Sequence, residues 1–192
     1  SKQLPLKQFI KMKKESAIKA LPIPRFFTSK GKNPLKEVEY VSRDTRITKQ
    51  DGSVVFEMKA FRTPKAWSQN ASDIIASKYA RKAGVPQRDE SGKLMKDENG
   101  KVITGAEKGA DQVVGRMTGC WRKWGEEHGY FDSKESADAY EAEMNYMLIN
   151  QMVAPNSPQW FNTGLNSAYG INGPAQGHYY ADPTTREMKK SE

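Results

Sequence analysis

The chain has 192 residues and a mass of 21.6 kDa, with 36% hydrophobic, 28% charged and 10% aromatic residues. This length and composition favour a folded domain with solvated segments and argue against wholesale disorder. The single cysteine, Cys120, excludes an internal disulfide framework and a cysteine-cluster zinc site, and two histidines are too few for most other metal sites. Because no apolar run reaches about 20 residues and no signal peptide is evident, we expect a cytoplasmic protein that does not enter a membrane.

The formal net charge of +8 is concentrated near the start of the chain. Residues 1–50 hold 13 Lys and Arg against 4 Asp and Glu, whereas the rest of the chain holds 18 against 19. A basic arm on a neutral body can contact phosphates, but lysine-rich ends are more often simply solvated. The charge therefore localises a candidate nucleic-acid contact without deciding the function.

The first predicted unit is this basic arm, over residues 1–36, which is broken by four prolines. It has room for one short helical turn around Phe9–Ile18. Its apolar Ile23, Phe26 and Phe27 are candidates for docking on another part of the protein.

Two β-hairpins are predicted next. Residues 37–61 alternate between apolar and polar side chains around Asp51-Gly52, a pair that suits a two-residue type I′ turn. The polar stretch 87–109 contains a second turn signal, Asn99-Gly100, and is expected to form a small exposed hairpin or flap.

Helical spacing of apolar residues predicts three amphipathic helices. The first should be capped by Thr63 and end before Gly84. The second covers Ala110–Trp124 and buries Cys120, with Gly115 and Gly119 leaving space for a neighbouring backbone.

The third helix is expected to start with Asp132 as the cap and Glu135 returning the hydrogen bond, and to end before Pro155. Its methionine-rich stripe is interpreted as a core face. The stripe consists of Ala137, Tyr140, Met144, Met147, Leu148 and Met152.

A search for complete catalytic motifs finds no phosphate-binding loop, dinucleotide fingerprint, zinc-protease motif or nucleophile elbow. Cys120 and His128 are the only thiol and imidazole close in sequence, and we interpret the cysteine as a buried residue rather than a nucleophile. His178, beside two tyrosines, is interpreted as a hydrogen-bonded packing residue.

Residues 154–164 and 170–180 are rich in small hydroxyl, amide and glycine residues. Such a loop offers hydroxyl and backbone N–H donors without bulky side chains, which suits a phosphate or a ribose. On composition alone, an ordered structural connection is the more frequent role.

These residues carry a family resemblance. Residues 150–165 read NQMVAPNSPQWFNTGL, and AYGI and GPAQGHYY follow at 168–171 and 173–180. The pattern closely resembles the N-terminal part of the large adenosylcobalamin-dependent (class II) ribonucleotide reductases. Supporting matches lie upstream, so the resemblance runs from about Pro24 to the end of the chain.

The resemblance implies an enzyme that converts ribonucleotides to deoxyribonucleotides by thiyl radical chemistry, initiated by adenosylcobalamin, on a ten-stranded α/β barrel. It implies an α+β fold class for this chain: a mostly helical N-terminal domain with one or two β-hairpins, leading into a barrel that the chain does not include. The expected units are a basic arm (1–36), a hairpin-plus-helical domain (37–153) and a substrate-lining loop that leads toward the barrel (154–192).

The resemblance also implies site residues and partners. Ser157 falls on the serine of the family's Asn-Ser-Pro motif and is implied as a contact to the substrate phosphates, with Asn156, Thr163 and Gly164 as weaker candidates for shaping the pocket. No catalytic or metal-binding residue is assigned. Adenosylcobalamin would be bound mainly by the missing barrel, and the complete enzyme would take a ribonucleotide substrate and dNTP or ATP effectors and form a homo-oligomer.

Two departures from the family pattern bear on this hypothesis. The family's first redox cysteine follows the GHYY stretch and is expected beyond Glu192, and Cys120 matches none of the family's cysteines. Asn166-Ser167 stands where a bulkier pair with an aromatic residue is expected. We therefore expect the isolated chain to be inactive.

Two other functions stay open on the sequence. In the first, the chain is a binding module whose basic arm contacts nucleic acid or an acidic partner. In the second, it is a scaffold that has lost the reductase chemistry. Strong salt dependence of binding would favour the arm, whereas a nucleotide pocket should respond weakly to salt and fail when Ser157 becomes bulky.

Overall fold

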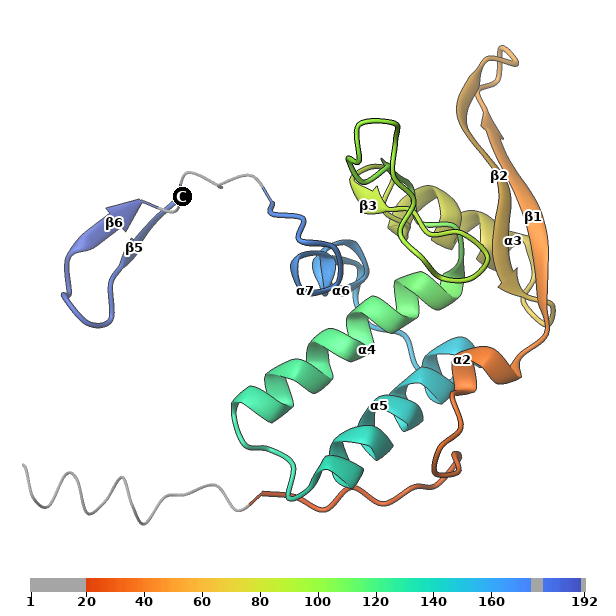
Figure 1. Cartoon of the computed structure of the whole chain (residues 1–192). Coiled ribbons are helices and arrows are strands. Elements are labelled where there is room, and N and C mark those ends of the chain that lie inside the picture. Colours follow the sequence, from red (N-terminus) through yellow and green to blue (C-terminus); the bar gives the residue numbers. More distant parts are fainter. Residues whose placement is uncertain (1–19, 174–177, 191–192) are drawn as a thin grey trace, which may run out of the picture.

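The computed structural model describes residues 20–173 and 178–190 and has an α+β fold with antiparallel hairpins (Figure 1). This confirms the predicted class of the segment itself. The helical turn expected at Phe9–Ile18 lies outside the described residues. In chain order the elements are α2 (Pro34–Glu37), β1 (Tyr40–Thr48), β2 (Val54–Pro64), α3 (Gln69–Ile74), η1 (Ile75–Tyr79), β3 (Val85–Pro86), β4 (Thr104–Gly105), α4 (Ala110–Glu127), α5 (Lys134–Ile149), α6 (Ser157–Asn162), α7 (Leu165–Tyr169), β5 (Tyr179–Ala181) and β6 (Met188–Lys190).

Strands β1 and β2 form the predicted hairpin, but its turn is not type I′. The N–H of Gly52 donates to the carbonyl of Lys49 (3.0 Å), and the N–H of Lys49 donates to the carbonyl of Ser53 (2.9 Å). Gly52 has a φ of 82°, whereas Asp51 is not among the residues with positive φ. A type I′ turn needs positive φ at both central residues, so the hairpin instead closes through a longer loop with glycine at its end.

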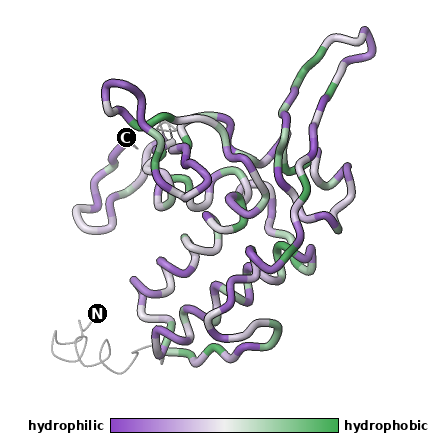
Figure 2. The backbone as a smooth tube through the Cα atoms, turned by 45° about the vertical axis from the view of Figure 1, so that its right-hand side comes forward, coloured by the Kyte–Doolittle hydropathy of each residue, from purple (hydrophilic) through white to green (hydrophobic). Residues whose placement is uncertain are grey.

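The polar stretch 87–109 folds into the exposed flap expected from its sequence, with one turn more than predicted. Bridges join Arg88 to Leu94 and Lys96 to Val102, around turns that end in Gly92 and Gly100. Both turns have the sequence Asp-Glu-X-Gly-Lys and the same backbone hydrogen bonds as the β1–β2 loop. The tip of the β1–β2 hairpin, which has the same type of turn, is also hydrophilic (Figure 2).

The first helix starts later than predicted. Ser68 caps α3 by accepting a hydrogen bond from the N–H of Ala71 (3.1 Å), while Thr63 stays in β2. The Thr63 hydroxyl is buried within 2.8 Å of both Ser72 Oγ and Arg43 Nη1, so tertiary contacts keep it in the strand. The helix then continues as the π-helix η1, which ends at Tyr79.

Helices α4 and α5 lie side by side as an antiparallel pair (Figure 1). The cap of α5 is Ser133, one residue later than predicted, because Asp132 accepts hydrogen bonds from the hydroxyls of Ser133 and Ser136 instead. Glu135 does not return a capping bond but pairs with Arg25 (2.9 Å).

The prediction that Gly115 and Gly119 of α4 allow close approach of a neighbouring backbone is wrong. Gly115 and Gly119 face side-chain atoms of Leu35 and Glu141 at ordinary distances, rather than a neighbouring backbone. The close backbone approach to α4 occurs elsewhere, at Gly164.

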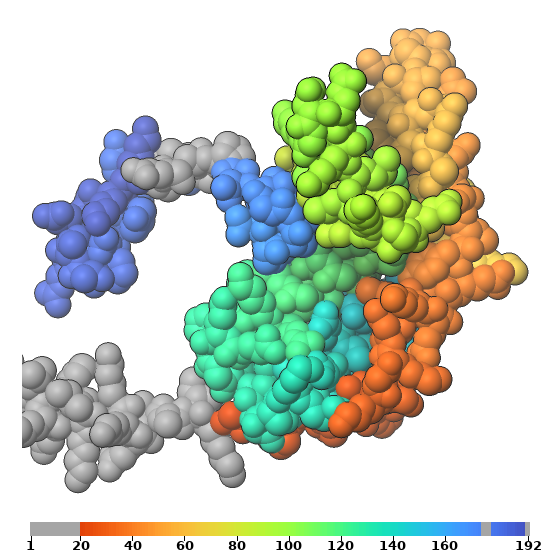
Figure 3. Space-filling view, viewed as in Figure 1, coloured from red at the N-terminus to blue at the C-terminus, as the bar shows by residue number. Residues whose placement is uncertain are grey.

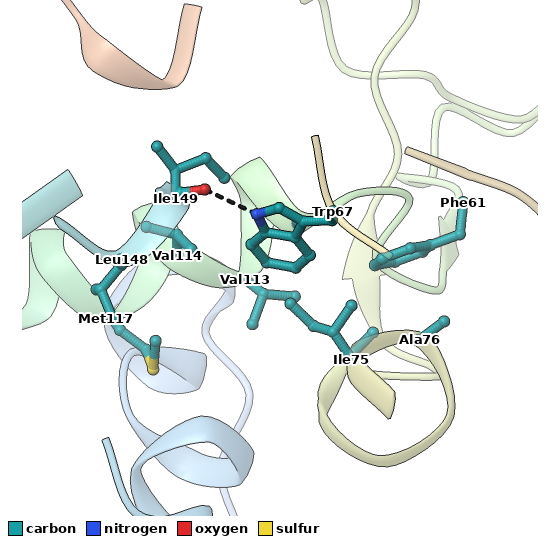
Figure 4. Packing of buried hydrophobic residues seen from close by; sticks show 11 residues of the cluster. Phe61, Trp67, Ile75, Ala76, Val113, Val114, Met117, Leu148 and Ile149 are labelled. Carbon is teal, nitrogen blue, oxygen red and sulfur yellow. Dashed lines mark hydrogen bonds between the residues drawn. The ribbon is translucent and has the colours of Figure 1, made fainter. Parts of the chain in front are cut away.

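The hydrophobic core joins the β1–β2 hairpin, α3, η1, α4 and α5 (Figure 4). Trp67 lies at its centre, and its indole N–H donates to the carbonyl of Ile149 (2.8 Å). Of the methionine-rich stripe, Leu148 is buried, but Met144 is only half-buried and Met152 lies beyond the helix with 51% of its surface exposed. The stripe is therefore a core face only in part.

Residues 20–36 run along α5, so the predicted docking of the apolar residues is confirmed for two of the three. Ile23 is half-buried and lines an apolar groove with Tyr140 and Met144 of α5, and its N–H donates to Ser136 Oγ (3.0 Å). The ring of Phe27 stacks on Tyr146 with centroids 5.0 Å apart. Phe26 stays exposed, but its N–H donates to the carboxylate of Glu143 (3.0 Å).

Candidate functional site

The segment expected to line the substrate is not an open loop but begins with the short helix α6. Asn156 is its N-cap, with the side-chain oxygen accepting a hydrogen bond from the N–H of Gln159 (3.3 Å). Pro158 follows within the first turn, where its missing N–H costs nothing. Asparagine and proline at these positions explain why the chain turns into a helix here.

Ser157 is the first residue of α6, and it is exposed. Its Oγ lies 3.1 Å from the hydroxyl of Tyr79, at the end of η1. The Tyr79 ring in turn packs against Trp160 and Phe161, with centroid distances of 5.6 and 5.3 Å. The exposed hydroxyl of Ser157 therefore lies on a helix whose aromatic residues, Trp160 and Phe161, pack against Tyr79 of η1.

Thr163 and Gly164 lie at the other end of α6 and are buried. The Thr163 hydroxyl donates to Gln159 Oε1 (2.6 Å). Gly164 has a φ of 84° and packs so closely on α4 that a Cβ would overlap the carbonyl oxygen of Arg116. The structure therefore separates the four candidate residues into an exposed pair, Asn156 and Ser157, and a buried pair that anchors the segment.

The anchor is a buried arginine. Arg116 of α4 forms an ion pair with Glu107, with 2.8 Å between Nε and Oε1 and no exposed side-chain surface on either residue. Its Nη1 donates to the carbonyl of Thr163 (2.8 Å), and its Nη2 donates to those of Trp160 (2.7 Å) and Tyr79 (3.2 Å). One guanidinium thus fixes α6 and η1 relative to each other. In Figure 3 the segment that contains α6 and α7 lies against α4.

Glu107 completes this network from its other side. Its carboxylate accepts hydrogen bonds from the hydroxyl of Tyr169 in α7 (2.8 Å) and from the N–H of Arg81 (2.7 Å). Burial and the negative charge of Glu107 raise the pKa of the Tyr169 hydroxyl, which therefore stays protonated as a donor. The buried carboxylate is fully partnered, as a charge in a protein interior requires.

The sequence interpretation did not identify Arg116 or Glu107. A signal was present, because Arg116 lies three residues after Val113 and one before Met117, on the apolar stripe of the helix. A charged residue on such a stripe is seldom buried without a partner. Its partner precedes the helix and could not be recognised from spacing.

An apolar groove of about 310 Å³ lies next to this site. Tyr79, Pro155 and Trp160 contribute to its wall, together with Trp67 and Ile75 from the core region. It runs between α3, η1 and the segment that leads into α6.

Cys120, His128 and His178 are the other residues that the sequence analysis considered for chemistry. Cys120 is buried, as expected, and His128 Nδ1 lies 2.9 Å from the carbonyl of Trp124. His178 is exposed before β5, so the predicted packing role is wrong. Within residues 20–173 and 178–190, no group of three or more His, Cys, Asp or Glu side chains is placed to hold a metal ion.

None of the described helices is both long enough and apolar enough to cross a membrane.

Comparison with known proteins identifies the family. The family described as class II vitamin B12-dependent ribonucleotide reductase matches residues 41–151. A vitamin B12-dependent ribonucleotide reductase from Bradyrhizobium diazoefficiens is 43% identical over 187 residues, which cover 88% of this chain and 15% of the relative. The protein of the same description from Agrobacterium fabrum is also 43% identical over 187 residues, covering 88% of this chain and 14% of the relative.

A more distant relative with the same description, from Streptomyces avermitilis, is 38% identical over 153 residues, covering 79% of this chain and 14% of the relative. The chain thus spans about 15% of the length of these relatives. The matched family range ends at residue 151, before the exposed Ser157. On these matches, the chain belongs to the class II vitamin B12-dependent ribonucleotide reductase family and corresponds to its N-terminal part.

Proposed function

We propose that this chain forms the N-terminal, substrate-lining part of an enzyme that reduces ribonucleotides to deoxyribonucleotides, and that Ser157 contacts the substrate phosphates. One observation carries the proposal. The hydroxyl of Ser157 is exposed, while the far end of the same helix is buried and held by Arg116. A donor fixed in this way can hold an anionic oxygen without first losing conformational freedom.

The other three candidate residues support Ser157 in different ways. Asn156 sets the direction in which α6 starts, because its side chain caps the helix. Thr163 and Gly164 shape the pocket from behind by seating the helix on α4. A small hydroxyl at the exposed end then leaves room for a phosphate and can donate a charge-assisted hydrogen bond to it.

The reactive parts of the enzyme lie outside this chain in our proposal. The barrel would hold most of the adenosylcobalamin, which would provide the radical chemistry when bound, and the remainder of the reductase would provide the redox cysteines. The complete enzyme would be a cytoplasmic homo-oligomer regulated by dNTP or ATP effectors. Residues 154–192 would form the connection to the barrel, after the arm (1–36) and the hairpin-plus-helical domain (37–153). The isolated chain would be catalytically silent.

The test uses a chimera in which this chain replaces the matching N-terminal part of the Bradyrhizobium diazoefficiens relative. Ser157→Ala should raise the KM for the ribonucleotide by roughly 10- to 150-fold, the range for one lost hydrogen bond to a charged group, with little change in kcat. Ser42→Ala, which alters an exposed serine on β1, is the control and should leave KM unchanged. An unchanged KM in the folded Ser157→Ala chimera would rule out the phosphate contact.

The comparisons do not support the alternative of a basic-armed binding module. Part of the local positive charge is also used within the fold, because Arg25 and Lys30 both pair with Glu135, and Lys32 pairs with Glu37.

A further inference from the structure

We propose that Tyr79 is a positioning residue that aims the hydroxyl proton of Ser157 at an anionic oxygen of the bound nucleotide. This inference rests on the proposed function, because it assigns a partner to the phosphate contact of Ser157. The two hydroxyl oxygens lie 3.1 Å apart, and either of them can be the donor.

The chemistry of an anion selects one of these two arrangements. A phosphate oxygen only accepts hydrogen bonds, so the Ser157 hydroxyl has to donate to it. Ser157 can do so while keeping its contact with Tyr79 only if Tyr79 donates to the Ser157 oxygen. The tyrosine hydroxyl then fills an acceptor position of the serine and leaves the serine proton free to point outward.

Tyr79 is held firmly enough for this role. Its ring is packed between contacts to Trp160 and Phe161, and it is half-buried rather than exposed. It is the last residue of the π-helix η1, a rare element that is frequent at functional sites. The π-helix therefore gives Tyr79 a position that an uninterrupted α-helix would not provide.

The buried ion pair holds together the two backbone segments that carry these hydroxyls. Nη2 of Arg116 donates both to the carbonyl of Tyr79 and to the carbonyl of Trp160, which lies on the same short helix as Ser157. The two segments are thus tied to one group at their backbones as well as through their side chains. The hydroxyl pair is in place before any ligand arrives, which lowers the entropic cost of binding.

The experiment is a double-mutant cycle in the chimera with the Bradyrhizobium diazoefficiens relative, with KM and kcat measured for the ribonucleotide. Tyr79→Phe removes only the hydroxyl and keeps the ring that packs on α6. We expect it to raise KM by roughly 3- to 10-fold, the range for a neutral hydrogen bond, and to leave kcat unchanged. In the Ser157→Ala background, the same substitution should have no further effect on KM.

Tyr140→Phe is the matched control, since Tyr140 is also half-buried but lies on α5, away from the hydroxyl pair. It should change neither constant. The unfolding midpoint of Tyr79→Phe should fall below that of this control only by the loss of one exposed hydrogen bond, because the ring contacts with Trp160 and Phe161 remain.

The outcomes separate the two hypotheses. If Ser157→Ala leaves KM unchanged, the proposed phosphate contact fails, and this inference fails with it. If Ser157→Ala raises KM but Tyr79→Phe does not, only the role of Tyr79 is overturned. It is also overturned if Tyr79→Phe raises KM equally in both backgrounds, because that result indicates an effect of packing alone.

Discussion

Arg116 and Glu107 form an ion pair in which neither side chain retains any exposed surface. The pair connects α4 to the segment before it, and its remaining hydrogen bonds reach η1, α6 and α7. A buried pair of this kind adds little net stability but is costly to break. It lets a helix of six residues hold a defined position, which such a short helix could not maintain on its own.

Removing the arginine should therefore destabilise the chain strongly. Arg116→Met keeps much of the side-chain volume but leaves the Glu107 carboxylate buried without its counter-charge, so we expect a loss of about 3–5 kcal/mol in the free energy of unfolding. Urea denaturation followed by circular dichroism measures it. Arg62→Met, which breaks the partly exposed pair with Asp111, is the control and should cost less than about 1 kcal/mol. Equal losses for the two variants would contradict the anchoring role of Arg116.

A methyl group at Gly164 should push α6 away from α4. Gly164→Ala meets two costs, a positive φ and an overlap with the carbonyl oxygen of Arg116. Gly170→Ala meets only the first, because Gly170 has a φ of 69° and nothing within 4 Å of the added atom. We expect Gly164→Ala to be less stable than Gly170→Ala by about 1–3 kcal/mol, the usual cost of overpacking, in the same denaturation assay. Similar values for the two would mean that α6 is not tightly seated.

Loss of the hydrogen bond from Trp67 to the carbonyl of Ile149 should destabilise the fold even when an aromatic ring stays in the core. Trp67→Phe keeps an aromatic ring in the core but leaves the buried carbonyl at the end of α5 without its donor, at a cost of about 1–3 kcal/mol. Trp124, with 47% of its surface exposed, provides the control. Trp124→Phe should change the stability by less than about 0.5 kcal/mol, and a larger effect there than at Trp67 would contradict the packing seen in Figure 4.

Glu143 should make the docking of residues 26–28 sensitive to acid. Burial alone would raise the pKa of its carboxyl, but hydrogen bonds from Thr28 and from the backbone N–H groups of Phe26, Phe27 and Thr28 outweigh it and hold the pKa below the ordinary value of 4.5. The stabilisation is thus fully present above pH 4.5 and is lost as the pH falls through the lower pKa of the folded state.

The comparison with Glu143→Gln tests this dependence. At pH 7 the variant should be less stable than the parent by about 1–3 kcal/mol, and the difference should shrink below pH 4.5. Glu90→Gln, in an exposed turn, is the control. A stability difference for Glu143→Gln that is constant between pH 7 and pH 3 would contradict the hydrogen-bonded carboxylate.

The main elements of the fold could be predicted from the sequence because they have strong periodic patterns. The alternation around Asp51-Gly52 indicated the first hairpin, and the helical spacing in Ala110–Trp124 indicated α4, which extends to Glu127. Two helix caps were misplaced, the second because Asp132 accepts hydrogen bonds from the neighbouring hydroxyls of Ser133 and Ser136, and the first because of contacts more distant in the chain. Thr63 is kept in its strand by Ser72 and Arg43, although its own sequence neighbourhood suits a cap.

The candidate site was predicted in part. Asn156 and Ser157 were identified through the family resemblance, but α6 itself was missed, although an asparagine cap with a proline in the first turn is a helix start signal. The ion pair between Arg116 and Glu107 was missed, since a separation of nine positions in the sequence gives no recognisable pattern. Contacts between segments distant in the chain, such as Tyr79 with Ser157, require the three-dimensional arrangement.

The central claim, that this chain serves as the N-terminal part of a ribonucleotide reductase, is tested most directly by measuring deoxyribonucleotide formation. The two samples are the isolated chain and the chimera with the Bradyrhizobium diazoefficiens relative, each supplied with cobalamin cofactor and reductant. We expect the chimera to form deoxyribonucleotide and the isolated chain to form none. A folded chimera without activity, or product from the isolated chain, would contradict the claim.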